Sequence, residues 1–419
     1  MRMRNQQMRR RFVPAALIAC LALTIAEAGG PVYSRFGVGD LYYFSGSRSN
    51  ALGGAGVGLF GDGFINNLNP AGLAGIMNTR FAGTFVYSNY SSTDISGSAR
   101  YARGDFGGLS AAIPVSKDYG VVVVGDLSPY SLVNYSILNN ASQSGISSGQ
   151  EFYGSGGISR FDIGSSVSIT NSLHAGFKIN YLAGTILQTT KVTFTDNSYS
   201  NNEMTLSDHY SGISFSFGVI YQGLGDILGS TLLKPLVLGL VVETPASLDL
   251  REEHFTLTAN QYDTTSTTYG SADIPLFVAI GVSYTFSERY VFAADLAMQD
   301  WSNAKPIAEP PAMFRNSMRA GAGIEIQPAK DASGYWGHVI YRAGFYYNSS
   351  YIQFNNQAIN GTFMTAGIGL PIGSDSHLNL GLQYGINGTT QNNLQKDNIF
   401  RLTVSISGSE LWFVRIQED

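Results

Sequence analysis

The stretch HLNLGLQYG, residues 377–385, decides the fold class. Its apolar residues recur at every second position and are separated by Asn, Gly and Gln. The same period of two returns in ISFSFGVIY (213–221) and in FRLTVSIS (400–407). Because the side chains of a strand point alternately to its two faces, this period predicts β-strands with one apolar face and one small or polar face.

Runs of this kind predict fourteen strands from residue 80 onward. They cover residues 80–90, 99–114, 119–136, 150–170, 172–194, 203–222, 235–258, 266–286, 288–302, 314–327, 336–349, 358–372, 377–388 and 397–413. Tight links alternate with longer polar stretches, such as 139–149, 195–202 and 261–268. Short turns at one rim and long loops at the other are typical of a transmembrane barrel, which an even number of antiparallel strands closes without an edge. We predict an all-β, 14-stranded antiparallel transmembrane β-barrel; the soluble alternative is a large secreted sandwich or β-helix.

The composition favours the membrane protein. Of 419 residues only 13% are charged, about half of the roughly 25% found in soluble proteins. The chain holds 24 Phe, 24 Tyr and 3 Trp, and its formal net charge is −5. A mildly acidic chain has no basic surface for phosphates, so we expect no nucleic-acid partner.

Residues 1–28 have the features of a signal peptide. Several arginines precede an apolar run from residue 12 to 25, and Ala26-Glu27-Ala28 forms a cleavage site. The only cysteine, Cys20, lies within this run. The sequence LIAC (17–20) also resembles a lipobox, so lipidation of Cys20 is an open alternative.

Residues 29–79, which we call the hatch, do not share the period of two. They contain many Gly and Asn residues and isolated apolar residues. Irregular backbone at membrane depth is tolerated only where protein buries it or a wet cavity receives it. We therefore expect the hatch to plug the lumen, and we divide the chain into a signal peptide (1–28), a hatch (29–79) and a barrel (80–419).

Three stretches carry a resemblance to a known family. SRFGVGDL (34–41) and RSNALGGAGVGLFGDGFINNLNPAGLAGI (48–76), with Asn69, Pro70 and Ala71, are similar to the hatch and its Asn-Pro-Ala motif in the FadL family of outer-membrane transporters for long-chain fatty acids and other hydrophobic compounds. IPLFVAIGVSYTFSERYVFAADLAMQDWSNAK (274–305) is similar to paired strands that end in Asp-Trp-Ser, here Asp300-Trp301-Ser302. The end of the chain, from residue 378 to 413, resembles the last hairpin of relatives in Bacteroidetes-like bacteria.

The resemblance implies a fourteen-stranded barrel with a hatch in the cell outer membrane of a diderm bacterium. It implies passive transport of hydrophobic or amphipathic small molecules such as long-chain fatty acids. The alternative is a non-transporting structural or protein-secretion-associated outer-membrane barrel, because relatives with this barrel serve in protein secretion and a fold does not settle cargo. We expect a monomer whose partners are outer-membrane lipid and a hydrophobic small molecule. The six residues after Trp412-Phe413 depart from the family's terminal aromatic residue.

The resemblance also implies a lateral opening at a kink in the third strand. Pro129 cannot donate to a strand ladder, so Leu127, Ser128, Pro129 and Tyr130 mark the possible opening. Alternatively, Pro129 marks only an irregularity of the strand above the membrane.

Two sets of residues are candidates for binding. Apolar hatch residues need a partner inside a wet barrel, and the possible substrate pocket consists of Phe60, Phe64, Ile65 and Leu68. The same residues would also serve simply to attach the hatch to the wall. The candidate lumen charges either orient a substrate carboxylate or pair with the hatch; they are Arg160, Lys178, Asp295 and Arg342.

Signals for catalysis are weak. GVGLFG (56–61) matches G-x-G-x-x-G, but no βαβ unit follows it. GISSG (145–149) matches G-x-S-x-G within a Ser-, Gly- and Asn-rich stretch rather than at a strand-to-helix turn. The five histidines have no metal-ligand spacing. We therefore expect no enzyme, no cofactor and no metal site.

Overall fold

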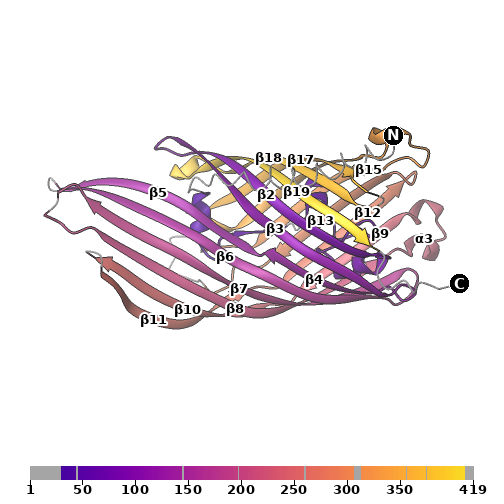
Figure 1. The fold of residues 1–419 in the computed structure, drawn as a ribbon, viewed down its shortest axis with the longest axis horizontal. Helices are drawn as coiled ribbons and strands as arrows, with labels where there is room; N and C mark the ends of the chain where they lie inside the picture. The colour runs from indigo at the N-terminus through magenta and orange to yellow at the C-terminus, as the bar shows by residue number, and fades with distance from the viewer. Residues whose placement is uncertain are drawn as a thin grey trace, which may run out of the picture.

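The computed structural model describes residues 30–43, 46–143, 146–196, 198–258, 261–305, 313–354, 356–373 and 375–410. The signal peptide, Cys20, Gly145 and Trp412-Phe413 lie outside these residues. Figure 1 shows long, tilted strands that wrap around a lumen, with the hatch inside it.

Nearly all of the regular structure is strand. The strands are β1 (Asp40–Leu41), β2 (Thr79–Thr93), β3 (Ser98–Ser116), β4 (Val121–Pro129), β5 (Ser131–Gln143), β6 (Ile146–Ser168), β7 (Leu173–Phe194), β8 (Asn202–Tyr221), β9 (Leu236–Glu243), β10 (Ala246–Thr258), β11 (Gln261–Ile274), β12 (Phe277–Phe286), β13 (Tyr290–Gln299), β14 (Met313–Phe314), β15 (Ser317–Ile326), β16 (Ile340–Phe354), β17 (Gln357–Pro371), β18 (His377–Gly388) and β19 (Lys396–Glu410). The short helices are α2 (Ser47–Ala51), α3 (Leu224–Ile227), α4 (Gly334–Gly337) and the 3₁₀ turns Val32–Arg35, Pro70–Gly75, Thr231–Leu233 and Gln391–Asn393. No helix in the described part of the chain is long and apolar enough to span a membrane.

The strands close into a barrel. β1 belongs to the hatch, and four wall strands are each interrupted once, as β4 and β5, β9 and β10, β11 and β12, and β14 and β15. The wall therefore has fourteen antiparallel strands. The last strand, β19, pairs with the first wall strand, β2, from Glu410↔Thr79 to Lys396↔Thr93. The predicted fold class is confirmed.

The alternation in HLNLGLQYG separates the lipid face from the lumen. Leu382 and Tyr384 are 43% and 58% exposed, whereas Gln383 between them is 1% exposed. Apolar side chains thus point outward and polar ones inward, the arrangement that lets a closed sheet sit in lipid. The chain has the architecture of an outer-membrane barrel.

Several strands extend beyond the membrane at the rim opposite the start of β2. The expected contrast of short turns at one rim and long loops at the other is not found: at the rim where β2 starts, residues 222–235 and 327–339 join strands, whereas at the other rim only two residues separate β5 from β6 and β10 from β11. β6, β7 and β8 have 23, 22 and 20 residues, whereas roughly 9 to 11 residues cross a bilayer. Figure 1 shows these strands, with β5, β10 and β11, reaching past the rest of the wall. The loops predicted at 139–149 and 261–268 were wrong, because these residues largely belong to β5, β6 and β11. Outside lipid both faces of a strand meet water, so a polar composition does not indicate a loop there.

The hatch lies inside the barrel and touches its wall on many sides. Its irregular backbone is hydrogen-bonded by wall side chains: Lys178 Nζ donates to Asn67 O at 2.9 Å, and Thr365 Oγ1 donates to Ala51 O at 2.9 Å. Glycines of the wall make room for it, and a Cβ on any of them would collide with hatch atoms; these glycines are Gly176, Gly218, Gly239, Gly321, Gly323 and Gly344. We call them the glycine girdle.

Candidate functional site

The Asn69-Pro70-Ala71 motif fixes one turn of the hatch to the wall. The side-chain oxygen of Asn69 accepts from Ala71 N at 3.0 Å, and its amide donates to Val57 O at 2.8 Å and Val219 O at 3.2 Å. Asn69 is fully buried, and Pro70 begins a 3₁₀ turn that Asn69 caps. The motif therefore joins two parts of the hatch to β8. GVGLFG (56–61), in contrast, contains no helix and is followed by none until residue 70.

The second family-like motif lies at the other end of the lumen. Trp301 is 1% exposed, its Nε1 donates to Gln299 Oε1 at 3.1 Å, and its ring centroid is 4.5 Å from that of Tyr351. Both rings belong to an apolar cluster that includes Val38 of the hatch and Leu182 and Leu248 of the wall. This cluster joins the start of the hatch to the lumen face of β5, β7 and β10.

The candidate lumen charges are occupied by protein groups. Lys178 contacts the hatch as described above and lies 3.2 Å from Asp162. Asp295 Oδ2 accepts from Gly56 N at 2.7 Å and Val57 N at 2.8 Å. These two charges therefore hold the hatch backbone.

The other two charges belong to ion-pair networks. Arg342 lies 2.6 Å from Glu325, and the same carboxylate receives Arg48 of the hatch at 2.7 Å. Arg160 lies 3.2 Å from Asp162 and 3.2 Å from Glu243. Pairing with the hatch thus describes Lys178 and Asp295, whereas Arg160 and Arg342 pair with wall carboxylates, and Arg342 shares its carboxylate with a hatch arginine.

The four candidate pocket residues line one cavity. This cavity, which we call the rim cavity, has a volume of about 530 Å³ and lies between the hatch and the rim at which β2 and β18 start and β15 and β19 end. Its lining includes Phe60, Phe64, Ile65 and Leu68. Arg48 stacks on the Phe64 ring at 3.8 Å. Three of the four also pack against buried clusters: Phe64, Ile65 and Leu68. They both attach the hatch and bound a cavity.

Strand pairing in the wall is broken beside Pro129. β3 pairs with β2 from Thr93↔Ser98 to Arg80↔Ala112. On its other side, β3 pairs only with β4, from Leu109↔Leu127 to Ser116↔Val121. β4 ends at Pro129, and the chain continues as β5, which pairs with β6. Among the described residues, none of β3 pairs with β5. We call this the wall break.

The wall break begins where the outward side chains of the adjacent strands change from apolar to small or polar. The last complete row of outward side chains across β3, β4, β6, β7 and β8 is apolar and 41–56% exposed, and it consists of Leu109, Leu127, Phe161, Tyr181 and Ile213. The next row across these strands holds Pro129, Ser159, Ala183 and Ser211. On β4, β6, β7 and β8 the break thus coincides with a change from apolar to small or polar outward residues.

The first part of the hatch covers the free edge of β5. β1 pairs with it at Asp40↔Leu132 and Leu41↔Ser131, and Tyr42 N donates to Tyr130 O at 2.8 Å. The Ser34 hydroxyl donates to Asn134 O at 3.1 Å and accepts from Asn134 N at 3.2 Å. Residues 34–42 thus take the place that β3 leaves empty.

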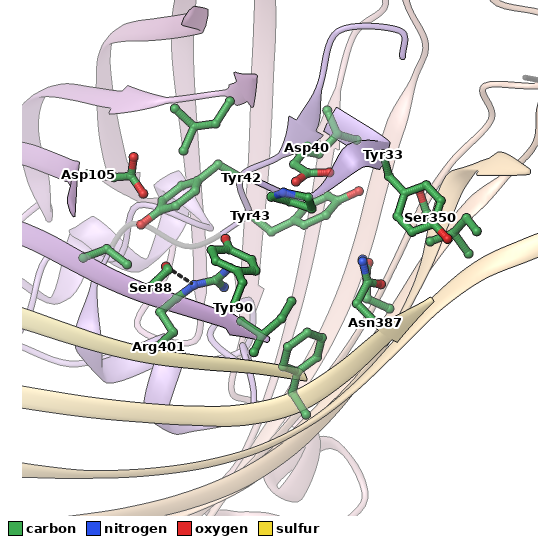
Figure 2. A pocket seen from close by; sticks show the side chains of 18 of the residues that line it. Tyr33, Asp40, Tyr42, Tyr43, Ser88, Tyr90, Asp105, Ser350, Asn387 and Arg401 are labelled. Atoms are coloured by element: carbon green, nitrogen blue, oxygen red, sulfur yellow. Dashed lines mark hydrogen bonds between the residues drawn. The ribbon is translucent and has the colours of Figure 1, made fainter. Parts of the chain in front are cut away.

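A second cavity, of about 110 Å³, lies behind the wall break. We call it the break cavity, and Figure 2 shows it. Its lining comes from both flanks of the break, with Arg103 and Asp105 on β3 and Leu132 on β5, and from hatch residues Asp40 to Tyr43. Arg401 of β19 also lines it.

The charges of the break cavity are only partly compensated. Arg103 Nε lies 2.8 Å from Asp105 Oδ2. Arg401 donates to neutral groups, Ser88 Oγ at 3.2 Å and Gln383 Oε1 at 3.1 Å. Burial raises the pKa of the Asp40 carboxyl to about 6, an effect that the charge of Arg103 opposes.

The sequence reasoning missed the glycine girdle and the break cavity. Girdle glycines stand out only once the inward face of each strand is assigned. The position of Arg401 facing the lumen could have been predicted, because in FRLTVSIS this residue lies on the polar face of the strand. No pattern along the chain joins it to Asp40, which the fold brings to the same cavity.

The comparisons with known proteins give a family and a fold. A family model described as BamG matches residues 8–419. No match was found among curated proteins. The fold is similar to the Ralstonia pickettii toluene transporter TbuX, with a TM-score of 0.60 at 12% identity, covering 87% of this chain and 98% of that one. It is also similar to a Pseudomonas aeruginosa FadL homologue, with a TM-score of 0.59 at 11% identity, covering 88% of this chain and 98% of that one. The P. putida toluene transporter TodX has a TM-score of 0.55 at 16% identity, covering 88% of this chain and 99% of that one. The resemblance to FadL-type channels is thus supported at the level of the barrel fold, while the family model carries another name.

Proposed function

The chain belongs to the BamG family, and we propose that it lets hydrophobic or amphipathic small molecules, such as long-chain fatty acids, cross the outer membrane passively. The observation that carries this proposal is the wall break at Pro129, where the last paired row is Leu109↔Leu127. An opening in the wall just beyond this apolar row offers an amphiphile a path between lumen and bilayer. Leu127, Ser128, Pro129 and Tyr130 would form its lower border.

The rim cavity supports the other end of such a path. Its apolar lining by Phe60, Phe64, Ile65 and Leu68 suits an alkyl or aromatic group, and a cavity of about 530 Å³ is in the range of ligand pockets, roughly 300–1,000 Å³. The relatives of similar fold include proteins named as toluene transporters. We further propose that Asn69, Pro70 and Ala71 act as the hatch motif of a FadL-like, Bacteroidetes-type branch.

The hatch helix α2 lies between the two cavities, because Asn50 lines the break cavity and Ser47 to Ser49 line the rim cavity. Passage therefore requires the hatch to shift. A reversible lock tests this. The side chains of Asn50 in the hatch and Thr403 in the wall are hydrogen-bonded at 3.1 Å, so cysteines at both positions would lie close enough for a disulfide after a small adjustment. In proteoliposomes, oxidised Asn50→Cys/Thr403→Cys protein should lose uptake of a radiolabelled fatty acid, and a reductant should restore it.

The matched control is Thr403→Cys alone, which should transport under both conditions. Equal uptake by locked and unlocked protein would contradict a route through the hatch. Absence of uptake by wild-type protein, above that of empty vesicles, would remove the transport proposal altogether.

A second candidate function is a structural or protein-secretion-associated barrel that does not transport. The observation that favours it is the firm attachment of the hatch, with the Arg48–Glu325–Arg342 network and the glycine girdle holding it from several sides. For this role the locked variant should support the protein's cellular role as well as the wild type does. Restored growth of a deletion strain by the oxidised, locked protein would therefore favour this candidate over transport.

A further inference from the structure

The break cavity differs chemically from the rim cavity. Its lining includes three guanidinium groups, two carboxylates and several tyrosines, namely Arg103, Arg319, Arg401, Asp40, Asp105, Tyr42, Tyr43, Tyr90 and Tyr346. An alkyl chain in this place would remove these groups from water without offering them hydrogen bonds, at a cost of about 1–3 kcal/mol for each group left unsatisfied. The cavity is therefore unsuited to an apolar ligand.

The mixture of charges also disfavours a simple ion. An anion drawn to Arg401, which has no carboxylate at salt-bridge distance in the described part of the chain, would meet the carboxyl of Asp40 on the same lining. A cation drawn to Asp40 would meet Arg103 and Arg401 instead. A neutral ligand with several hydroxyl groups suits both sides, because each hydroxyl donates to a carboxylate and accepts from a guanidinium.

Aromatic rings of the hatch complete the lining. Tyr42 and Tyr43, which Figure 2 shows beside Asp40, add aromatic faces for the C–H surface of a ring.

Size and position narrow the ligand further. A volume of about 110 Å³ is of the same order as the roughly 150 Å³ cavity that holds one benzene ring in another protein, so a single small head group fits. The lining spans the wall break, from Arg103 and Asp105 on β3 to Leu132 on β5. A molecule held here can keep its head group in the lumen and its alkyl chain in the adjacent leaflet.

We propose that the break cavity binds a hydroxyl-rich, uncharged head group, a sugar ring or a smaller polyol, carried by an amphiphile whose chain lies in the bilayer. The assignment specifies which class of amphiphile would use the proposed passage. Binding in the cavity does not depend on transport, and only the entry of the amphiphile through the wall break rests on the proposed function. The head group is held by Asp40 and Arg401. Free sugar offers the same hydroxyls without the chain, so the two sources are distinguishable.

Calorimetry on protein in an ether detergent, tetraethylene glycol mono-octyl ether, tests the assignment. The probes are octyl β-glucoside, free glucose and octyl phosphate. Octyl β-glucoside should bind at least tenfold more tightly than octyl phosphate, and more tightly than glucose because of its chain. If glucose and octyl β-glucoside bind with comparable affinity, the cavity is a sugar site, but its ligand does not come from the membrane.

The variants locate the binding. Asp40→Asn keeps the size of the side chain and removes its charge, so the protein should fold and bind octyl β-glucoside at least tenfold more weakly. Arg401→Gln should weaken the binding too, whereas Lys330→Gln in the exposed turn before β16 should not. Tighter binding of octyl phosphate, no binding of the glucoside, or unchanged binding by both Asp40→Asn and Arg401→Gln would each overturn the proposal. Fatty-acid uptake is a separate measurement, so uptake without glucoside binding removes this inference alone, and binding without uptake removes only the transport proposal.

Discussion

The hatch meets the barrel differently at its two ends. Residues 47–78 lie against the glycine girdle, and wall side chains such as Asp295 bind their backbone directly. Residues 34–42 instead cover the free edge of β5 and border a cavity with incompletely compensated charges. One end has the close packing of a structural core. The other has the features of a ligand site, so movement and binding are expected there first.

The largest effect should come from filling the glycine girdle. Gly176→Val places a side chain against the backbone of Pro70, and such overpacking costs roughly 3 kcal/mol or more when the backbone has to move. We expect a large loss of thermal stability and protease cleavage within the hatch. Gly125→Val is the matched control, because its Cβ meets nothing within 4 Å. Similar behaviour of the two variants would show that the hatch does not depend on the girdle.

A smaller loss should follow from Asp295→Ala. This change leaves the N–H groups of Gly56 and Val57 buried without their acceptor, which costs about 1–3 kcal/mol for each such group. Hydrogen exchange at residues 52–60 should become faster while exchange at 34–42 is unchanged. The exposed Asp249→Ala serves as control. Faster exchange at both ends of the hatch would mean that the two ends form a single cooperative unit.

The strands could be predicted from the sequence because each wall residue faces either lipid or lumen. This two-sided environment produces the period of two in HLNLGLQYG, and it fades where β5, β6 and β11 leave the membrane. The rim cavity could be located from Phe60 and Phe64, since apolar residues in a polar segment need a partner. The break cavity could not, because its groups meet only after the barrel closes.

The charge of Asp40 gives a pH dependence at the ligand end. Because burial raises its pKa from 3.8 to about 6, the folded state binds a proton that the unfolded state has lost between these values. The contribution of this group to stability is therefore fully present below about pH 4. It is lost as the pH rises through about 6, a decrease of about 3 kcal/mol in the free energy of unfolding. Arg103, Arg401 and Asp397 are the charges that act on it. Asp40→Asn should remove this fall in thermal unfolding measured at pH 4, 5, 6 and 7; a slope that persists in the variant would assign it to other groups.

The smallest change in stability is expected from Pro129→Val, at the border between the two regions. The valine restores an N–H that proline lacks, and it lies directly above the last β3–β4 pair, Leu109↔Leu127. If the break depends on the missing donor, pairing should extend upward and stability should rise by about 0.5–1 kcal/mol, the net value of one hydrogen bond. Slower hydrogen exchange at residues 104–108 would report the new pairing, and octyl β-glucoside binding should slow as its access narrows. Gly108 has a φ of 141°, a conformation that also turns β3 away from the ladder, so unchanged exchange in the variant would identify this bulge, rather than the proline, as the cause of the wall break.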